Sequence, residues 1–329
     1  MNMHGYRVII VTPVYEDREA SGRLFQELAK EFGHDVFVVA VDDGSVSEPL
    51  QIESLDKANI NGVILRLRRN VGHQRAIAIG LGYVSEYIRP DQRVVVMDSD
   101  GEDLPGTISN LLDQLKPDVF DVAVAQRKNR VETLQFKIFY AIYKWFFSLM
   151  TGRSISFGNF MALKPRAVKR LVCMQELSIH VAGAVLSSKL RTSVLPIDRG
   201  PRYAGKSKMN FVGLTLHGFK ALMIFAEDVL VRVGIACVLI ATLSVLGSMT
   251  AVFLKVLGYS TPGWSSVVLG ILILMLLQTG ALALMTLMLT GVMRSGTVTT
   301  IISYRDFVDQ IISTSKNAEN EGQFIWKCS

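Results

Sequence analysis

The chain has 329 residues, half of them hydrophobic, and a formal net charge of +6 at neutral pH. This length and composition favour one sizeable soluble domain joined to membrane segments, and the positive charge fits a protein that lies against anionic lipid. Nucleic-acid binding would also explain the charge, but the sequence contains no nucleic-acid motif, so we expect no nucleic-acid partner. The three cysteines are scattered and form no C-x-x-C pair, so no zinc site is indicated.

The first 130 residues alternate short apolar runs with helical patterns, which predicts a mostly parallel, doubly wound α/β sheet. Predicted strands cover residues 7–12, 35–41, 63–67, 94–97 and 119–125, and predicted helices cover 16–32, 74–87 and 104–115. Polar clusters follow the strands at residues 12–17, 42–45, 68–73 and 98–103. Because ligands of open α/β sheets bind at the carboxyl ends of the strands, we expect these clusters to form a nucleotide site at one edge.

A cluster of four acids follows the strand predicted at 94–97: Asp98, Asp100, Glu102 and Asp103. Asp98 and Asp100 are one residue apart and repel each other unless a cation or hydrogen-bond donors lie between them. Hard oxygen ligands at this spacing suit Mg²⁺ or Mn²⁺ carrying a diphosphate. The alternative interpretation is a solvated acidic turn.

Two long apolar runs occupy the later part of the chain, at residues 229–254 and 267–293. Each exceeds the ~20 residues that a helix needs to cross a bilayer. The short link at 255–266 contains glycine and proline, so the two runs predict a hairpin. Three arginines flank the ends of the pair, against one lysine in the link, and the positive-inside rule then places the N-terminal domain in the cytoplasm. The flanking arginines are Arg232, Arg294 and Arg305.

Two aromatic stretches, at residues 134–150 and 209–225, have the composition of helices that lie in the headgroup layer of a membrane. Packing against the sheet or against each other is the alternative.

Four motifs occur in a fixed order along the predicted edge: Pro13-Val14-Tyr15-Glu16-Asp17, Val41-Asp42-Asp43-Gly44-Ser45, Arg69-Asn70-Val71-Gly72 and Asp98-Ser99-Asp100. In this order and spacing they resemble the inverting family 2 glycosyltransferases with a GT-A fold. More narrowly, the chain is similar to the polyprenyl-phosphate glycosyltransferases, which include dolichyl-phosphate mannose synthase and its bacterial relatives. The resemblance covers nearly the whole chain. It implies a GT-A catalytic domain over 1–208, an amphipathic helix over 209–228, a transmembrane hairpin over 229–294 and a C-terminal tail over 295–329.

The resemblance implies a nucleotide site in the first two motifs. The loop with Pro13, Tyr15 and Glu16 would hold the base and ribose, and Asp43 would bind the base. A turn that caps the following helix and an ordinary D-G turn are the alternative interpretations of these residues. His73, which follows the third motif, is expected to be a structural or rim residue rather than a catalytic base.

The resemblance also implies that Asp98, Asp100 and Glu102 bind Mg²⁺ or Mn²⁺, with Asp98 and Asp100 as catalytic residues and Asp98 close to the donor. Many relatives carry glutamine at the position of Glu102, and glutamate is still an oxygen ligand. Asn159 replaces the carboxylate of an element that commonly reads Gly-Asp-Phe, so the charge that the family carries there is absent.

Two basic clusters complete the implied site. Arg127 and Arg130 fall where the family carries residues that meet the acceptor phosphate, and the planar fork of arginine suits that contact. Arg202, Lys206 and Ser207 fall in a loop that closes over the nucleotide diphosphate, with Arg202 also expected to be catalytic. The alternative for Arg127 and Arg130 is a solvated surface patch, and the alternative for the loop with Arg202 is a basic loop that faces the membrane.

The expected function is therefore inverting transfer of a sugar from a UDP- or GDP-linked donor to a polyprenyl phosphate in the bacterial inner membrane. The expected partners are the nucleotide-sugar, the polyprenyl phosphate and membrane lipid, with self-association left open. A polysaccharide synthase would usually carry a Q-x-x-R-W motif and more spans, and neither is present in the sequence. A non-catalytic sugar-nucleotide sensor or scaffold is the rival from a different class.

Overall fold

The computed structural model describes residues 3, 5–116, 118–127, 134–154, 157–203, 211–259, 261, 263–295 and 303–314. The chain divides into two compact units. The first contains residues 1–140, 155–224 and 301–329, and the second contains residues 141–154 and 225–300.

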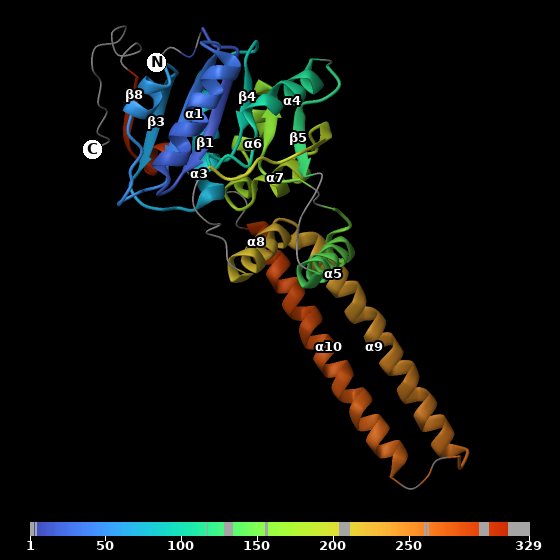
Figure 1. Cartoon of the computed structure of the whole chain (residues 1–329). Helices are drawn as coiled ribbons and strands as arrows, with labels where there is room; N and C mark the ends of the chain where they lie inside the picture. Colours follow the sequence, from blue (N-terminus) through green and yellow to red (C-terminus); the bar gives the residue numbers. More distant parts are fainter. Residues whose placement is uncertain are drawn as a thin grey trace. The chain divides into compact units, whose positions relative to one another are not determined.

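Within the described residues, an eight-stranded sheet forms the centre of the first unit (Figure 1). Its strands in chain order are β1 (Val8–Val14), β2 (Val36–Asp42), β3 (Asn61–Leu67), β4 (Arg93–Val96), β5 (Val122–Arg127), β6 (Met161–Leu163), β7 (Thr192–Ile197) and β8 (Val308–Ser313). Their spatial order is β7-β5-β6-β4-β1-β2-β3-β8. β1 is parallel to β2 and β4, β2 to β3, and β5 to β7, whereas β6 and β8 run antiparallel to their neighbours. The predicted mostly parallel sheet is confirmed.

Helices cover both faces of this sheet. They are α1 (Arg18–Phe32), α2 (Glu53–Lys57), α3 (His73–Tyr87), α4 (Ile108–Leu115), α6 (Pro165–Val172) and α7 (Val181–Ser187), and a further helix of this unit, α8 (Phe211–Ile224), contacts α7. Ile9 and Val11 of β1 enter a core shared with α3, α6 and α7, while Val8 and Ile10 enter a second core shared with α1, α2 and α4. Both faces are therefore covered, which explains why β1 and β2 are apolar runs rather than alternating patterns.

Residues 303–314 return to the sheet of the first unit. β8 pairs with β3, with Ile312 opposite Ile64. Just before β8, the ring of Tyr304 meets the ring of Tyr83 edge-on with centroids 5.8 Å apart, and its hydroxyl donates to Glu86 at 2.8 Å. The sequence analysis expected only a tail after residue 294. This strand instead covers the edge of β3, which would otherwise expose unpaired backbone groups.

The second unit contains two long apolar helices, α9 (Ala226–Val256) and α10 (Trp264–Ser295), which lie side by side in Figure 1. Both are long and apolar enough to cross a membrane, and they contain the two apolar runs of the sequence. The buried residues of α9 recur every seventh position and are small: Cys237, Ser244 and Ala251. Small residues on one stripe let two membrane helices approach closely.

The start of α9 is tied to the end of α5 (Leu134–Thr151) within the second unit. Arg232 donates from Nη1 to the carbonyl oxygen of Leu149 at 2.7 Å, where the last turn of α5 leaves carbonyls without helical partners. Gly152 follows with a φ of +70°, and a Cβ there would lie 2.5 Å from Nη2 of Arg232. Arg232, expected as a flanking charge, therefore also caps α5. Trp145 and Phe146 of α5 are 66% and 42% exposed, in line with the expected interfacial helix.

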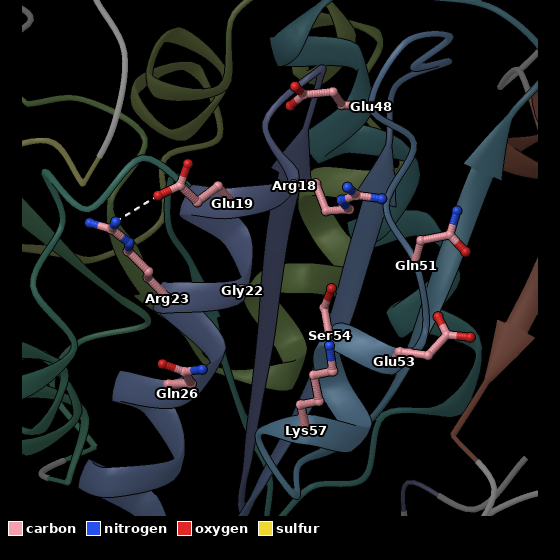
Figure 2. A pocket seen from close by; sticks show the side chains of 10 residues that line it. All are labelled: Arg18, Glu19, Gly22, Arg23, Gln26, Glu48, Gln51, Glu53, Ser54 and Lys57. Atoms are coloured by element: carbon pink, nitrogen blue, oxygen red, sulfur yellow. Dashed lines mark hydrogen bonds and ion pairs between the residues drawn. The ribbon is translucent and has the colours of Figure 1, made fainter.

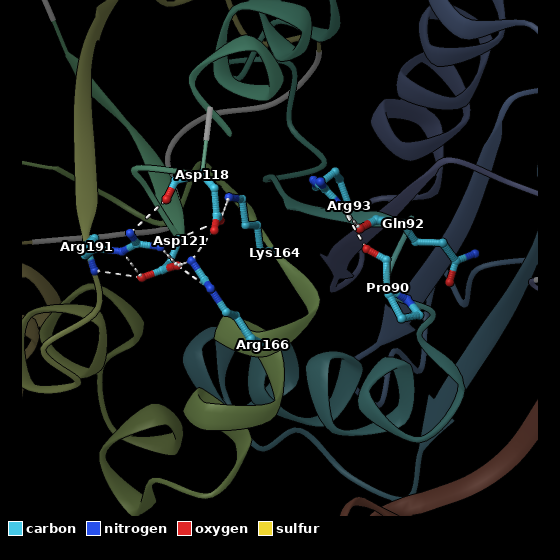
Figure 3. Close-up of polar contacts among 8 residues, drawn as sticks. All are labelled: Pro90, Gln92, Arg93, Asp118, Asp121, Lys164, Arg166 and Arg191. Atoms are coloured by element: carbon cyan, nitrogen blue, oxygen red, sulfur yellow. Dashed lines mark hydrogen bonds and ion pairs between the residues drawn. The ribbon is translucent and has the colours of Figure 1, made fainter. Parts of the chain in front are cut away.

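A carboxylate at the amino ends of β5 and β7 binds two arginines (Figure 3). Asp121, 8% exposed, accepts from Nε and Nη2 of Arg191, both at 3.0 Å, and also pairs with Arg166. Asp118 meets the same arginines and Lys164, but its side chain is 81% exposed. Charge-assisted, two-pronged bonds of this kind join strands that are far apart in the sequence.

Asp121→Ala should lower the free energy of unfolding by about 2–3 kcal/mol, because it removes a buried carboxylate that accepts charge-assisted hydrogen bonds from two half-exposed arginines. Asp113→Ala, on α4, is the matched control and should cause a much smaller loss, since its ion pair with Lys116 joins two exposed side chains. Chemical denaturation in detergent measures both. Equal losses for the two variants would contradict this assignment.

Candidate active site

The acidic cluster lies at the carboxyl end of β4, as predicted. A tight turn orders it: the backbone N–H of Asp98 donates to Asp103, and the backbone N–H of Glu102 donates to Asp100, both at 3.0 Å. Gly101 lies between the acids with a φ of +89°, which glycine adopts without strain. The side chains of Asp98 and Asp100 are 25% and 15% exposed, so the two carboxylates are only partly solvated.

Residues 199–203, called here the arginine segment, run along the acidic turn. The backbone N–H of Gly200 donates to the carbonyl of Glu102 at 3.0 Å, and that of Tyr203 donates to the carbonyl of Asp100 at 2.9 Å. A Cβ at Gly200 would lie 2.8 Å from the carbonyl oxygen of Gly101, so only glycine permits this approach. The segment is thus held by its backbone as well as by its side chains.

Both arginines of the segment bind the acids. Nη2 of Arg202 lies 2.9 Å from Oδ2 of Asp100, and its Nε donates to Oε1 of Glu102 at 2.8 Å. Arg199 pairs with Glu102 and lies 4.0 Å from Asp103. The structure therefore brings together three residues predicted for the site, Asp100, Glu102 and Arg202, and adds Arg199.

The acidic cluster is partly buried, and the two arginines offset its charge. Burial and the neighbouring Asp98 raise the pKa of Asp100 above its ordinary value, while Arg202 and Arg199 oppose that shift. Among the described residues, no three acids, histidines or cysteines are placed as a ready-made metal cage. Mg²⁺ is commonly held by one or two carboxylates plus substrate phosphates, so this donor set fits a cation that arrives with a diphosphate.

Asp43 connects the loops after β2 and β3. Its carboxylate accepts from the backbone N–H groups of Val71 at 2.7 Å and Gly72 at 3.0 Å. Burial raises the pKa of this carboxyl, and the two N–H donors act against that. Gly44, with a φ of +69°, would place a Cβ 2.5 Å from the backbone of Arg69. The expected base-binding residue therefore also sets the spacing of two loops at the edge of the sheet.

Glu16 connects the loops after β1 and β2. Its carboxylate accepts from the backbone N–H groups of Val46 and Glu48, both at 2.6 Å, and of Ser47 at 3.0 Å. These bonds hold Glu16 at a φ of +47°, which is unusual for a residue other than glycine. Glu16 thus shapes the expected nucleotide loop, while the neighbouring Tyr15 is 43% exposed. Pro13 lies inside β1, opposite Val41 of β2.

His73, expected at the rim, lies against the acids. Its Nε2 is 3.2 Å from Oδ1 of Asp98 and 3.0 Å from the side-chain nitrogen of Asn159. Burial lowers the pKa of His73, but the hydrogen bond to Asp98 and the charges of Asp98, Asp100 and Asp103 together outweigh burial, so the pKa is raised. Sequence reasoning missed this contact. Two features of the sequence could have indicated it. Asn159 replaces the carboxylate that the family carries at that position, and His73 is the first residue of α3, at the same edge of the sheet.

The expected acceptor cluster is only partly visible. Arg127 is the last residue of β5, at the same edge of the sheet as the acids, and only its backbone is described. Arg130, Lys206 and Ser207 lie outside the described residues. Their roles stay predictions from the sequence.

A polar cavity of about 900 Å³ lies between α1 and the segment that leads into α2 (Figure 2). Its lining consists of Arg18, Glu19, Gly22, Arg23, Gln26, Glu48, Gln51, Glu53, Ser54 and Lys57. None of these residues belongs to the site predicted from the sequence. Two of them contact the site: Nη1 of Arg23 donates to the carbonyl of Tyr203 at 3.0 Å, and the backbone N–H of Glu48 donates to Glu16 at 2.6 Å.

The sheet is mostly parallel, with paired acids at the carboxyl end of β4, and the chain has the GT-A fold of glycosyltransferases. Residues 9–156 match the family described as Glycosyl transferase family 2, and this part of the chain is a domain of that family. The protein is a glycosyltransferase.

Curated relatives have narrower names. The chain is 26% identical over 285 residues to the bactoprenol glucosyl transferase of Shigella phage SfV, covering 82% of this chain and 88% of that protein. It is 25% identical over 218 residues to the undecaprenyl-phosphate 4-deoxy-4-formamido-L-arabinose transferase of Salmonella paratyphi B, covering 63% of this chain and 64% of that protein. Among solved structures, glucosyl-3-phosphoglycerate synthase of Mycobacterium tuberculosis, in complex with Mg²⁺ and uridine diphosphate, matches 68% of this chain and 79% of its own with 11% identity and a TM-score of 0.47.

Proposed function

We propose that the protein transfers a sugar from a nucleotide-sugar to a polyprenyl phosphate at the membrane, with inversion at the anomeric carbon. The main observation behind the proposal is the acidic cluster at the carboxyl edge of the GT-A sheet, which two arginines contact. The same chain has two helices long and apolar enough to cross a membrane. The names of the two curated relatives, which specify bactoprenol and undecaprenyl phosphate, support the acceptor class. The sugar and the nucleotide stay open.

Asp98, Asp100 and Glu102 would hold Mg²⁺ or Mn²⁺, since carboxylate oxygens are the ligands that these ions prefer. When bound, the cation would neutralise charge on the diphosphate. The contact of His73 with Asp98 would fix the orientation of that carboxylate. Arg202 and Arg199 would place positive charge beside the leaving group from the opposite side of the acidic turn.

The acceptor supplies its own nucleophile in this reaction. A phosphate monoester is ionised near neutral pH, so one of its oxygens attacks the anomeric carbon and the nucleoside diphosphate leaves with the bonding electron pair. Neither a covalent enzyme intermediate nor a strong general base is required. The contribution of the protein is then placement of the two substrates and stabilisation of developing charge. Arg127 and Arg130 are our candidates for placing the acceptor phosphate.

Chain connectivity supports a hairpin whose two ends lie on one side of the membrane. The first unit contains both the residues before α9 and the strand β8 that follows α10. With the flanking arginines, the positive-inside rule assigns that side to the cytoplasm. Self-association of the chain stays open, as in the sequence analysis.

A reporter fused after residue 329 should therefore report the cytoplasm, and a reporter inserted at Tyr259, in the link between α9 and α10, should report the opposite side. Paired alkaline phosphatase and fluorescent protein fusions in a bacterial host measure this. If both fusions report the same side of the membrane, the proposed transmembrane hairpin is wrong.

A donor and acceptor screen tests the proposed function. The purified protein in detergent would be supplied with polyprenyl phosphate, Mn²⁺ or Mg²⁺ and a panel of UDP- and GDP-sugars. The mass of the lipid product would be measured by mass spectrometry. A lipid carrying one sugar through a phosphodiester is the expected product. Donor binding without any transfer, across the whole panel, would instead indicate a sensor or scaffold.

A further inference from the structure

Tyr203 holds the arginine segment against helix α1. Its hydroxyl donates to the carboxylate of Glu27 in a short hydrogen bond, and Arg23, one turn earlier on α1, donates to its carbonyl at 3.0 Å. Its ring lies over Gly101, where a Cβ would come within 2.5 Å of a ring carbon. The backbone bond from Tyr203 to the carbonyl of Asp100 completes the attachment. The segment is thus fixed at residue 203 by four separate contacts.

This attachment determines where the guanidinium of the preceding residue lies. Arg202 is adjacent to the fixed residue and reaches both Asp100 and Glu102, at 2.9 and 2.8 Å. Those oxygens belong to two of the three acids expected to hold the cation. A divalent cation binds carboxylate oxygens at about 2.0–2.2 Å, so a cation and a guanidinium cannot fill the same position on one oxygen. Arg202 is therefore placed as a competitor for the cation.

We propose that Tyr203 is a positioning residue that keeps Arg202 on Asp100 and Glu102 before the donor binds, and that the cation enters by exchange with this guanidinium while the segment stays held at Tyr203. The inference rests on the proposed metal-dependent transfer. It explains how an acidic cluster folds without a metal, because the arginine offsets the repulsion between carboxylates. After exchange, the released guanidinium is already beside the position of the diphosphate.

Arg202 then has two opposite effects. In the absence of donor it weakens metal binding, because the cation must displace it. During transfer it assists, because it adds charge next to the leaving diphosphate. An arginine with a purely structural role would show neither effect, and one that only binds phosphate would show the second effect alone.

The test is the affinity of the full-length protein in detergent for Mn²⁺ without any nucleotide, from the electron paramagnetic resonance signal of free Mn²⁺. Arg202→Gln should bind Mn²⁺ roughly tenfold more tightly than the wild type, the lower end of what one charge-assisted hydrogen bond contributes. Tyr203→Phe keeps the ring over Gly101 but loses the bond to Glu27, and should bind a few-fold more tightly, about threefold. Glu27→Ala removes the same bond from the other side and should match it.

Tyr304→Phe is the matched control, because it also removes a tyrosine-to-glutamate hydrogen bond in the first unit, the one to Glu86. It should bind Mn²⁺ as the wild type does. Limited trypsin digestion gives a readout that requires no metal. Cleavage after Arg199 and Arg202, mapped by mass spectrometry, should be faster in Tyr203→Phe and Glu27→Ala than in the wild type or the control.

The outcomes separate this inference from the proposed function. If Asp100→Ala binds Mn²⁺ as well as the wild type, the metal site itself is wrong. If Asp100→Ala loses Mn²⁺ but Arg202→Gln, Tyr203→Phe and Glu27→Ala bind it with unchanged affinity, the metal site stands and the exchange is overturned. Unchanged trypsin cleavage in both Tyr203→Phe and Glu27→Ala would overturn the positioning role of Tyr203.

Discussion

Asp100→Ala should reduce sugar transfer by roughly 10²–10³-fold or more, the loss that follows removal of one main charge-stabilising group from an active site. Asp100 is the least exposed of the acids that meet Arg202, and its carboxylate also accepts from the backbone N–H of Glu102. Its loss removes a proposed metal ligand and a hydrogen bond of the turn that holds the other acids. Product formation with saturating donor and acceptor measures the effect.

Two controls distinguish this effect from unfolding. Asp113→Ala removes an acid of α4 that pairs only at the surface with Lys116, and transfer should be unchanged. The thermal unfolding midpoint of Asp100→Ala should stay close to that of the wild type, because the buried cores of the sheet do not include it. Wild-type activity in Asp100→Ala would remove the argument for a metal at this cluster.

Arg202→Ala should lower kcat about ten- to a hundredfold, while Arg127→Ala should chiefly raise the KM for polyprenyl phosphate by a similar factor, since each loses a charge-assisted contact. Arg202 binds the acids beside the expected diphosphate, so its charge matters most as the leaving group forms. Arg127 ends β5 and precedes the aromatic helix α5 in the sequence, where the resemblance to polyprenyl-phosphate glycosyltransferases predicts a contact with the acceptor phosphate.

Steady-state kinetics with donor and acceptor varied separately distinguish the two roles. Arg93→Ala is a suitable control, because this arginine begins β4, at the opposite end of the strand from the acids, and donates to the backbone carbonyls of Pro90 and Gln92. If Arg202→Ala and Arg127→Ala both change only the KM for the nucleotide-sugar donor, the assignment of the two basic clusters is wrong.

Much of the parallel sheet could be predicted because its strands are continuous apolar runs that end in polar clusters. The short strands were missed for physical reasons. β6 has only three residues, and β8 gains its stability from pairing with β3, some 250 residues earlier in the chain, as the bond between Thr314 and Asn61 shows. Pro13 was expected to end the first strand. β1 continues to Val14 because β4 pairs with β1 only as far as Val11, so the missing N–H of Pro13 interrupts no bond of that ladder.

The sequence predicts which candidate residues follow the strands at this edge of the sheet, but it does not predict what their side chains contact. Glu16 and Asp43 were expected to contact the nucleotide, whereas their carboxylates bind backbone N–H groups of neighbouring loops. Arg202 and Glu102 are separated by 100 residues, and nothing in a single sequence states that they meet. Motif spacing identifies which groups reach the edge of the sheet, and long-range pairing decides which charges they face there.

The position of β8 after the membrane helices has a consequence for biosynthesis. The open edge of β3 is made early, but the strand that covers it leaves the ribosome only after both apolar helices have been made. Until then the catalytic sheet has an exposed edge that is prone to pair with other chains. Completion of the domain is therefore delayed until the hairpin has been synthesised, so chains that stop within α10 should accumulate as aggregation-prone, unfinished enzymes.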